Sequence, residues 1–286
     1  MAVVKQTAQE RIDALMQEAS LALVERRYFH CERLCVDALQ QAHAAADYER
    51  MSRIVLPLQE ARRQKRDMAV DAAERGHVFI LDAIPPLPGD IKPGMYFVQP
   101  PRVGLDGKLL REAADRGEIP ILVIVREPTT LLGQCPIVAL GPLTARVRID
   151  GPEYQSAAAA KKTKAKAGAP AAKKPPRAAA PAPISHAIDP ASSLSTMSSG
   201  NGQTPIPTVR WMLHASEALG DASIAAVDTA RGPISRADEL YLRLQGHTDH
   251  EKLHQALMKA CEEVVKLGPG AVKRKPIDEE DEMEDE

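Results

Sequence analysis

A long low-complexity stretch divides this chain and limits what it can fold into. Residues 155–207 read QSAAAAKKTKAKAGAPAAKKPPRAAAPAPISHAIDPASSLSTMSSGNGQTPIP, which is dense in Ala, Pro, Ser and Lys and has no aromatic side chain. Such a segment buries too little apolar surface to offset the entropy that it would lose on ordering. We therefore expect a disordered linker at 155–207, with folded sequence on either side.

The charges are unevenly distributed along the chain. The first half of the linker carries only basic charges: Lys161, Lys162, Lys164, Lys166, Lys173, Lys174 and Arg177. The end of the chain, PIDEEDEMEDE, is acidic, and we expect residues 269–286 to be a disordered tail. The formal net charge of -2 is therefore a balance between a basic linker and an acidic tail. About 150 residues precede the linker and about 60 lie between it and the tail, which suggests two modules.

Composition excludes several classes of protein. The chain has 286 residues, of which 44% are apolar, so it can build a hydrophobic core. No apolar run approaches the ~18 residues of a membrane span, and the start, MAVVKQTAQER, lacks the apolar stretch of a secretory signal. Four cysteines are too few for a disulfide framework. These features predict a cytoplasmic protein without a membrane partner.

Residues 1–76 have the apolar spacing of helices. Thr7 and Glu10 match a capping box, and apolar residues recur at helical spacing after them. A second helix is expected over about 29–45, and Asp47 can cap a third. We expect these helices to form a helical segment with a paired-helix hairpin at its start.

The segment RYFHCERLCVDAL, residues 27–39, resembles the second helix of a tetratricopeptide repeat. The resemblance covers residues 11–46 and is carried by one aromatic, one bulky and three small positions: Tyr28, Cys35, Ala19, Cys31 and Ala38. It implies a repeat-like helical hairpin that offers a protein-binding surface. An ordinary helical hairpin without this relationship is the alternative.

Residues 77–154 change to the pattern of a small α/β domain. Strands are expected at VFILDAI, MYFVQ, IPILVIVRE, PIVAL and TARVRI, with a helix through LLREAADR that Asp106 can cap. MYFVQ, this helix and IPILVIVRE make one βαβ unit of parallel strands. TARVRI alternates apolar residues with arginine, which predicts a half-exposed edge strand. Ligands of open α/β sheets bind beyond the carboxyl ends of the strands, where Arg102, Arg126 and Glu127 would lie.

Residues 208–268 are predicted to be a C-terminal module of three or four helices. A turn is expected at Leu219-Gly220-Asp221, and Thr248 is expected to open the last helix. The whole chain is thus predicted to be α+β and mainly α. A repeat-like hairpin would pack on a small α/β sheet, with the helical module following the disordered linker.

The sharpest chemical motif is HEKLH, which matches the zinc-hydrolase pattern H-E-x-x-H. On a helix, His250 and His254 would lie one turn apart and could share a metal ion while Glu251 activates its water. His247 is on the same face and could add a third imidazole. However, Thr248 and Glu251 also match a capping box, which gives the glutamate a structural role. We therefore expect no cofactor and no catalytic site, with a zinc hydrolase as the least favoured alternative.

The sequence favours a non-catalytic interaction or scaffold protein that binds another protein through helical surfaces and tethers a second module. The candidate partner-binding residues are the basic and aromatic ones of the N-terminal helices: Arg26, Arg27, Tyr28, Arg62, Arg63 and Arg66. The alternative is a protein that associates with nucleic acid through the basic linker.

Overall fold

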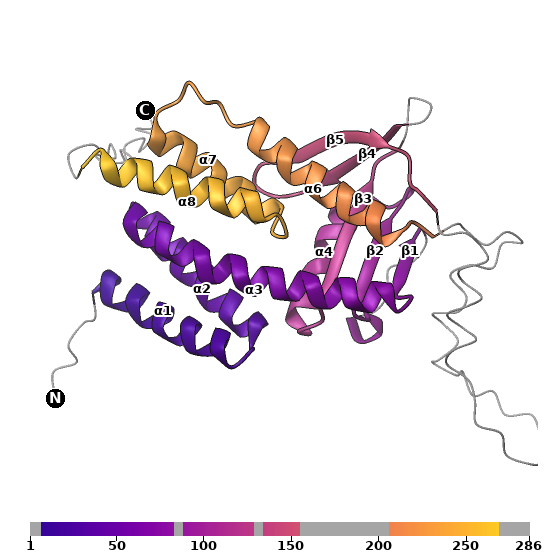
Figure 1. The fold of residues 1–286 in the computed structure, drawn as a ribbon, viewed down its shortest axis with the longest axis horizontal. Helices are drawn as coiled ribbons and strands as arrows, with labels where there is room; N and C mark the ends of the chain where they lie inside the picture. Colours follow the sequence, from indigo (N-terminus) through magenta and orange to yellow (C-terminus); the bar gives the residue numbers. More distant parts are fainter. Residues whose placement is uncertain (1–6, 83–87, 129–133, 155–205, 269–286) are drawn as a thin grey trace, which may run out of the picture. The chain divides into compact units, whose positions relative to one another are not determined.

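The computed structural model describes residues 7–82, 88–128, 134–154 and 206–268, and it confirms the predicted α+β, mainly α class (Figure 1). The helices are α1 (Ala8–Val24), α2 (Tyr28–Ala44), α3 (Tyr48–Glu74), α4 (Gly104–Arg116), α6 (Val209–Ala225), α7 (Pro233–Gly246) and α8 (Glu251–Lys266). The strands are β1 (Val78–Leu81), β2 (Gly94–Val98), β3 (Ile121–Arg126), β4 (Gln134–Ala139) and β5 (Ala145–Asp150). Within these ranges, no helix has the length and apolar character needed to cross a membrane.

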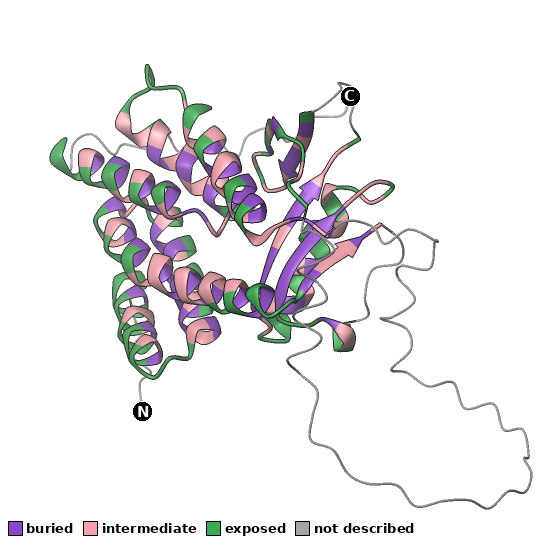
Figure 2. Ribbon diagram, turned by 45° about the vertical axis from the view of Figure 1, so that its right-hand side comes forward, coloured by how far each residue is buried: buried purple, intermediate pink, exposed green. Residues whose placement is uncertain are grey.

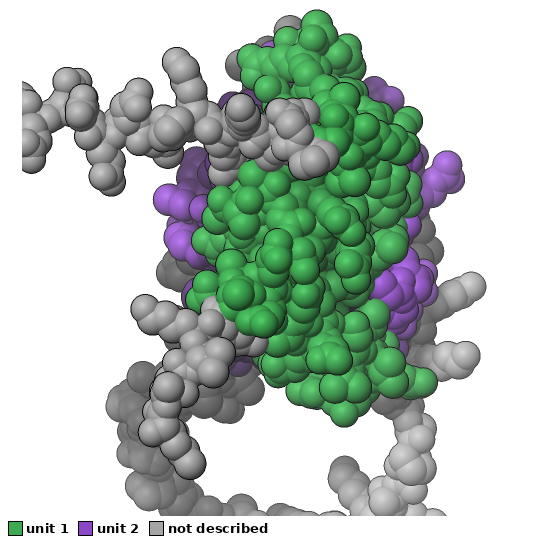
Figure 3. Space-filling view, turned by 90° about the vertical axis from the view of Figure 1, so that its left-hand side faces the viewer, with its two compact units in different colours: residues 1–59, 227–241, 254–286 green, residues 60–226, 242–253 purple. Residues whose placement is uncertain are grey.

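The chain forms two compact units, which Figure 3 distinguishes by colour. The first unit comprises residues 1–59, 227–241 and 254–286, and the second comprises 60–226 and 242–253. Their limits differ from the predicted domain limits, because α6 shares a unit with the sheet instead of forming a separate C-terminal module. Three of the four boundaries fall within α3, α7 and α8, and the fourth follows the end of α6.

In the first unit, α1 and α2 form a helical hairpin. The predicted capping box is confirmed: the Thr7 amide donates to the Glu10 carboxylate at 2.8 Å, and the Glu10 amide donates to the Thr7 hydroxyl at 3.2 Å. The small residues Ala19 and Cys31 are fully buried, so the two helices can approach closely. Arg26 has a φ of 61° and closes the turn between them.

Helix α3 begins where the sequence predicts it. Asp47 accepts a hydrogen bond from the Arg50 amide at 3.0 Å, as a capping residue does. Near this helix start, Asp238 of α7 accepts a hydrogen bond from the Tyr48 hydroxyl at 2.9 Å and lies 3.1 Å from His43 Nε2. These contacts hold α2, α3 and α7 together within the first unit.

The second unit contains a five-stranded sheet in the order β1-β2-β3-β4-β5. The first three strands are parallel and the last two run antiparallel to their neighbours. All five predicted strands are confirmed, as is the βαβ unit formed by β2, α4 and β3. β5 lies at the edge, and its exposed Arg146 and Arg148 alternate with buried Ala145 and Ile149, as predicted.

Helices cover both faces of this sheet. Met95 and Phe97 of β2 face a core that includes Ala69 of α3 and Trp211 of α6, while Tyr96 faces a second core under α4. The central strands are therefore buried on both sides, as Figure 2 shows. This two-sided burial explains the nearly continuous apolar runs in the sequence of β2 and β3.

The predicted limits of α4 and α6 are wrong. Helix α6 runs without a break through Leu219-Gly220-Asp221, where a turn was predicted. Helix α4 has Val103 as its N-cap, and Asp106 lies in the first turn, where its carboxylate accepts a hydrogen bond from the Val103 amide at 2.8 Å. In both cases the helix is longer than its local sequence signals suggest.

The segment 155–205, which lies outside the described residues, is inserted between two points that are close together. Tyr154 and Pro207 form an antiparallel bridge, and the Thr208 amide donates to the Glu153 carbonyl at 2.7 Å. The described residues on either side of this segment therefore lie next to each other in the second unit.

Candidate functional site

The HEKLH segment begins a helix differently from the prediction. α8 starts at Glu251, and the amide of Leu253 donates to His250 Nδ1 at 3.2 Å, so His250 is the capping residue. The predicted Thr248–Glu251 capping box is therefore wrong. Thr248 instead accepts a hydrogen bond from Arg111 at 3.4 Å.

The His250 ring and the Glu251 carboxylate also lie close to oppositely charged or polar groups. Because His250 Nδ1 accepts a hydrogen bond, its neutral ring carries the proton on Nε2, which lies 3.2 Å from Glu217 Oε2 and 3.3 Å from Asp221 Oδ1. Burial lowers the pKa of His250 despite these two carboxylates. Glu251, the supposed catalytic base, forms an ion pair with Arg66 at 2.7 Å.

His247 and His254 are buried as well, with 7% and 1% of their surface exposed. His247 Nε2 lies 2.9 Å from the Ser216 carbonyl, and burial lowers the pKa of His247 to about 4. Among the described residues there is no group of three His, Cys, Asp or Glu side chains placed to hold a metal ion. The described geometry gives His247 and His250 structural contacts.

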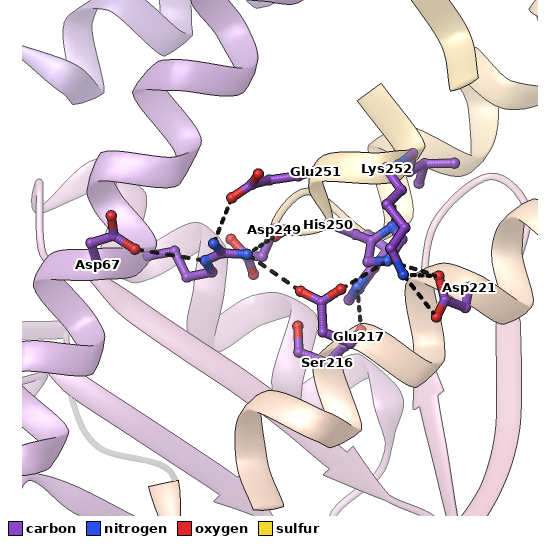
Figure 4. A network of polar contacts seen from close by, with 11 residues as sticks. Asp67, Ser216, Glu217, Asp221, Asp249, His250, Glu251 and Lys252 are labelled. Carbon is purple, nitrogen blue, oxygen red and sulfur yellow. Dashed lines mark hydrogen bonds and ion pairs between the residues drawn. The ribbon is translucent and has the colours of Figure 1, made fainter. Parts of the chain in front are cut away.

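The turn that precedes α8 is fixed by a dense polar network (Figure 4). Arg111 of α4 pairs with the buried carboxylate of Asp249, while Arg66 of α3 donates to the Asp249 carbonyl at 3.2 Å. Burial would raise the pKa of Asp249, but the nearby charges of Arg111 and His247 lower it overall. We call the residues of this network the turn clamp: Arg66, Arg111, Ser216, Glu217, Asp221, His247, Asp249, His250 and Glu251.

The predicted partner-binding residues are divided between the units. In the second unit, Arg62 is 7% exposed, Arg66 belongs to the turn clamp, and Arg63 pairs with Glu60 at 2.7 Å. In the first unit, Arg26 and Arg27 lie in the turn after α1, where Arg27 pairs with Glu25 at 2.6 Å, and Tyr28 begins α2.

The remaining predicted site residues belong to the sheet domain and to the linker. Arg102 and Glu127 follow the carboxyl ends of β2 and β3, where they form ion pairs with Asp106 and Arg146 at 3.6 and 3.0 Å. Arg126 ends β3. The basic linker residues Lys161, Lys162, Lys164, Lys166, Lys173, Lys174 and Arg177 lie outside the described residues.

A surface feature that the sequence reasoning missed is a groove between α1 and α3 in the first unit, of about 560 Å³. We call it the α1–α3 groove; it is lined by Glu10, Asp13, Ala14, Met16, Gln17 and Ser20 of α1 and by Arg50, Arg53 and Ile54 of α3. An adjoining depression of about 510 Å³ shares Ala14, Gln17 and Ser20 and extends to Leu21 and Val24.

The charged side chains of the α1–α3 groove differ in whether they form ion pairs. Arg50 binds both oxygens of Asp13 at 2.9 Å, and this contact lowers the pKa of Asp13. Arg50 also pairs with Asp47 at 2.8 Å. Arg53 is exposed and, within the part of the chain that the structure describes, has no hydrogen bond or ion pair from its side chain. It is therefore the cation of the groove that can accept an external carboxylate.

The outer face of α1 carries two exposed apolar side chains beside this groove. Leu21 is 62% exposed and Val24 is 82% exposed, and they follow Ala14 and Gln17 on the same face. In the sequence, Leu21 and Val24 lie off the stripe of Ile12, Ala19 and Ala22 that forms the buried face. Apolar residues outside the buried stripe are the feature of the sequence that could have indicated a second apolar face.

No family model matches this chain, and neither does any curated protein or solved structure.

Proposed function

We propose that this protein is a non-catalytic interaction protein that binds an amphipathic helix of another protein in the α1–α3 groove. The observation that carries the proposal is the combination, on one face of the first unit, of exposed Leu21 and Val24 with Arg53. Large exposed apolar side chains next to a concave surface are typical of interaction sites.

The spacing of the exposed stripe favours a helical occupant. Ala14, Gln17, Leu21 and Val24 are separated alternately by three and four residues, which is the spacing of a coiled-coil seam. A helix of about three turns would run alongside them and place apolar side chains on Leu21 and Val24. An acidic residue near one end of that helix would pair with Arg53, whereas Arg50 already pairs with Asp13.

The resemblance to a tetratricopeptide repeat supports the same proposal, since such hairpins bind protein segments. Ala19, Cys31, Cys35 and Ala38, which carry the resemblance, are all fully buried. A cytoplasmic location is part of the proposal, and it is supported by four buried cysteines that form no disulfide.

The proposal can be tested by selection from a displayed library of amphipathic helices, with the full-length protein as bait. We expect enriched sequences that combine an apolar stripe with a terminal Asp or Glu. The double variant Leu21→Ser/Val24→Ser should lose this enrichment, because the apolar contact surface is removed.

The matched control is Leu105→Ser/Leu109→Ser on α4, which removes two leucines that are 53% and 51% exposed. This control should select the same helices as the wild-type protein. Enrichment that survives Leu21→Ser/Val24→Ser, or that is lost equally in the control, would contradict the proposed site.

A further inference from the structure

The turn clamp contains a buried titratable group that the proposed function does not use. His247 is 7% exposed, and its Nε2 lies 2.9 Å from the Ser216 carbonyl of α6. A carbonyl only accepts hydrogen bonds, so the neutral ring donates from Nε2 and leaves Nδ1 without a proton. A second proton would place a positive charge in this buried position.

We propose that the turn clamp is an acid-released latch that holds the turn between α7 and α8, with His247 as its proton acceptor. In the released turn His247 is hydrated and takes up a proton readily, whereas in the clamped turn it does not. Acid therefore favours the released state, which frees the start of α8 from the contacts of Arg66 and Arg111.

The charged neighbours of His247 come from three places. Asp249 in the turn favours the protonated ring, whereas Arg111 of α4 and His250 oppose it. Burial outweighs Asp249 and lowers the pKa of His247 to about 4. The His247 ring therefore remains neutral around neutral pH while the clamp is closed.

The other titratable members of the clamp respond in the same direction. His250 faces Glu217 and Asp221 of α6 and Lys252 of α8, and burial lowers its pKa. The pKa of Asp249 is lowered overall, because Arg111, His247 and Lys65 outweigh its burial. A pKa that is lower in the clamped state means that the released state binds more protons, so acid weakens the clamp at each of these sites.

The size of the effect follows from linkage. A histidine with a pKa of about 6.5 when hydrated and about 4 when clamped raises the released population about 30-fold between pH 8 and pH 5. The rise begins below about pH 6.5 and levels off near pH 4.

Hydrogen exchange of the full-length protein, corrected for the intrinsic pH dependence of exchange, measures this release in peptides that cover residues 247–253. We expect protection there to fall about 30-fold from pH 8 to pH 5. His247→Gln keeps a donor for the Ser216 carbonyl but cannot titrate, so most of the fall should disappear. His214→Gln, on the exposed face of α6, is the matched control and should behave as the wild-type protein does.

A titration of the wild-type imidazole signals by NMR makes the test independent of how well the variant folds. A His247 midpoint near pH 4 supports the latch. A midpoint near 6.5, or protection at 247–253 that is the same at pH 5 and pH 8, overturns it.

Discussion

Gly220 lies beneath the ring of His250, and a Cβ atom at this position would be 2.0 Å from the ring Cγ. Gly220→Ala should therefore destabilise the protein by about 1–3 kcal/mol, because either the ring or α6 must move. Urea unfolding measures this change. Gly232→Ala is the matched control, since no atom lies within 4 Å of its added Cβ, and it should cost much less. Equal costs at the two glycines would contradict the close packing of His250 on α6.

Asp249 and Arg111 form a largely buried ion pair, with side chains that are 9% and 22% exposed, so removing one partner should cost more than removing both. Arg111→Met leaves the Asp249 carboxylate, whose side chain is 9% exposed, without its main counter-charge. We expect a loss of about 3–5 kcal/mol in unfolding free energy.

The double variant Arg111→Met/Asp249→Asn should recover part of that loss, because no unpaired charge remains. A double-mutant cycle measured by urea unfolding gives the coupling energy. A coupling energy near zero would show that the two side chains do not depend on each other.

At the scale of elements, sequence reasoning located most helices and all five strands but misplaced several boundaries. Thr7 and Glu10 were identifiable because a capping box depends only on neighbouring residues. The continuity of α6 through Gly220 was not identifiable, since it depends on packing against a histidine far along the chain. Likewise, the Thr248–Glu251 pattern did not reveal that His250 caps α8, which begins at Glu251.

The site was less predictable than the fold. Buried faces follow helical periodicity, but the sequence does not show that Asp13 accepts its hydrogen bonds from Arg50 and leaves Arg53 without one. The apolar pair Leu21 and Val24 could be seen in the sequence. The sequence did not show that this pair adjoins a groove lined by α3.

The capping residue Thr7 of helix α1 should contribute measurably to the unfolding free energy. Thr7→Ala removes the acceptor of the Glu10 amide and should lower the unfolding free energy by about 1 kcal/mol. Ser20→Ala, at an exposed position inside the same helix, should be neutral or slightly stabilising, because alanine has the higher helix propensity. Thermal unfolding monitored by circular dichroism compares the two variants, and equal effects would contradict the capping role.

At the scale of the whole molecule, the bridge between Tyr154 and Pro207 brings together the two described ends that flank residues 155–205. Replacing these residues with a short Gly-Ser connection should leave the melting temperature nearly unchanged, because the two ends already lie together. Calorimetry tests this expectation, and loss of the cooperative transition would show that the replaced residues support the fold.

The same deletion distinguishes the alternative function. If the basic linker binds nucleic acid, the full chain should show binding that weakens steeply with salt, and the deletion should abolish it. Binding of helices in the α1–α3 groove should not change, since the groove lies in the first unit.

The most direct test of the proposed function is a charge exchange across the α1–α3 groove. A selected helix with a terminal glutamate is labelled, and its affinity is measured by fluorescence anisotropy. Arg53→Glu should weaken binding at least about tenfold, and a helix with lysine in place of that glutamate should recover it. Arg11→Glu, an equal charge change on α1 outside the groove, should have little effect. Equal losses for Arg53→Glu and Arg11→Glu, without recovery by the lysine helix, would contradict recognition in this groove.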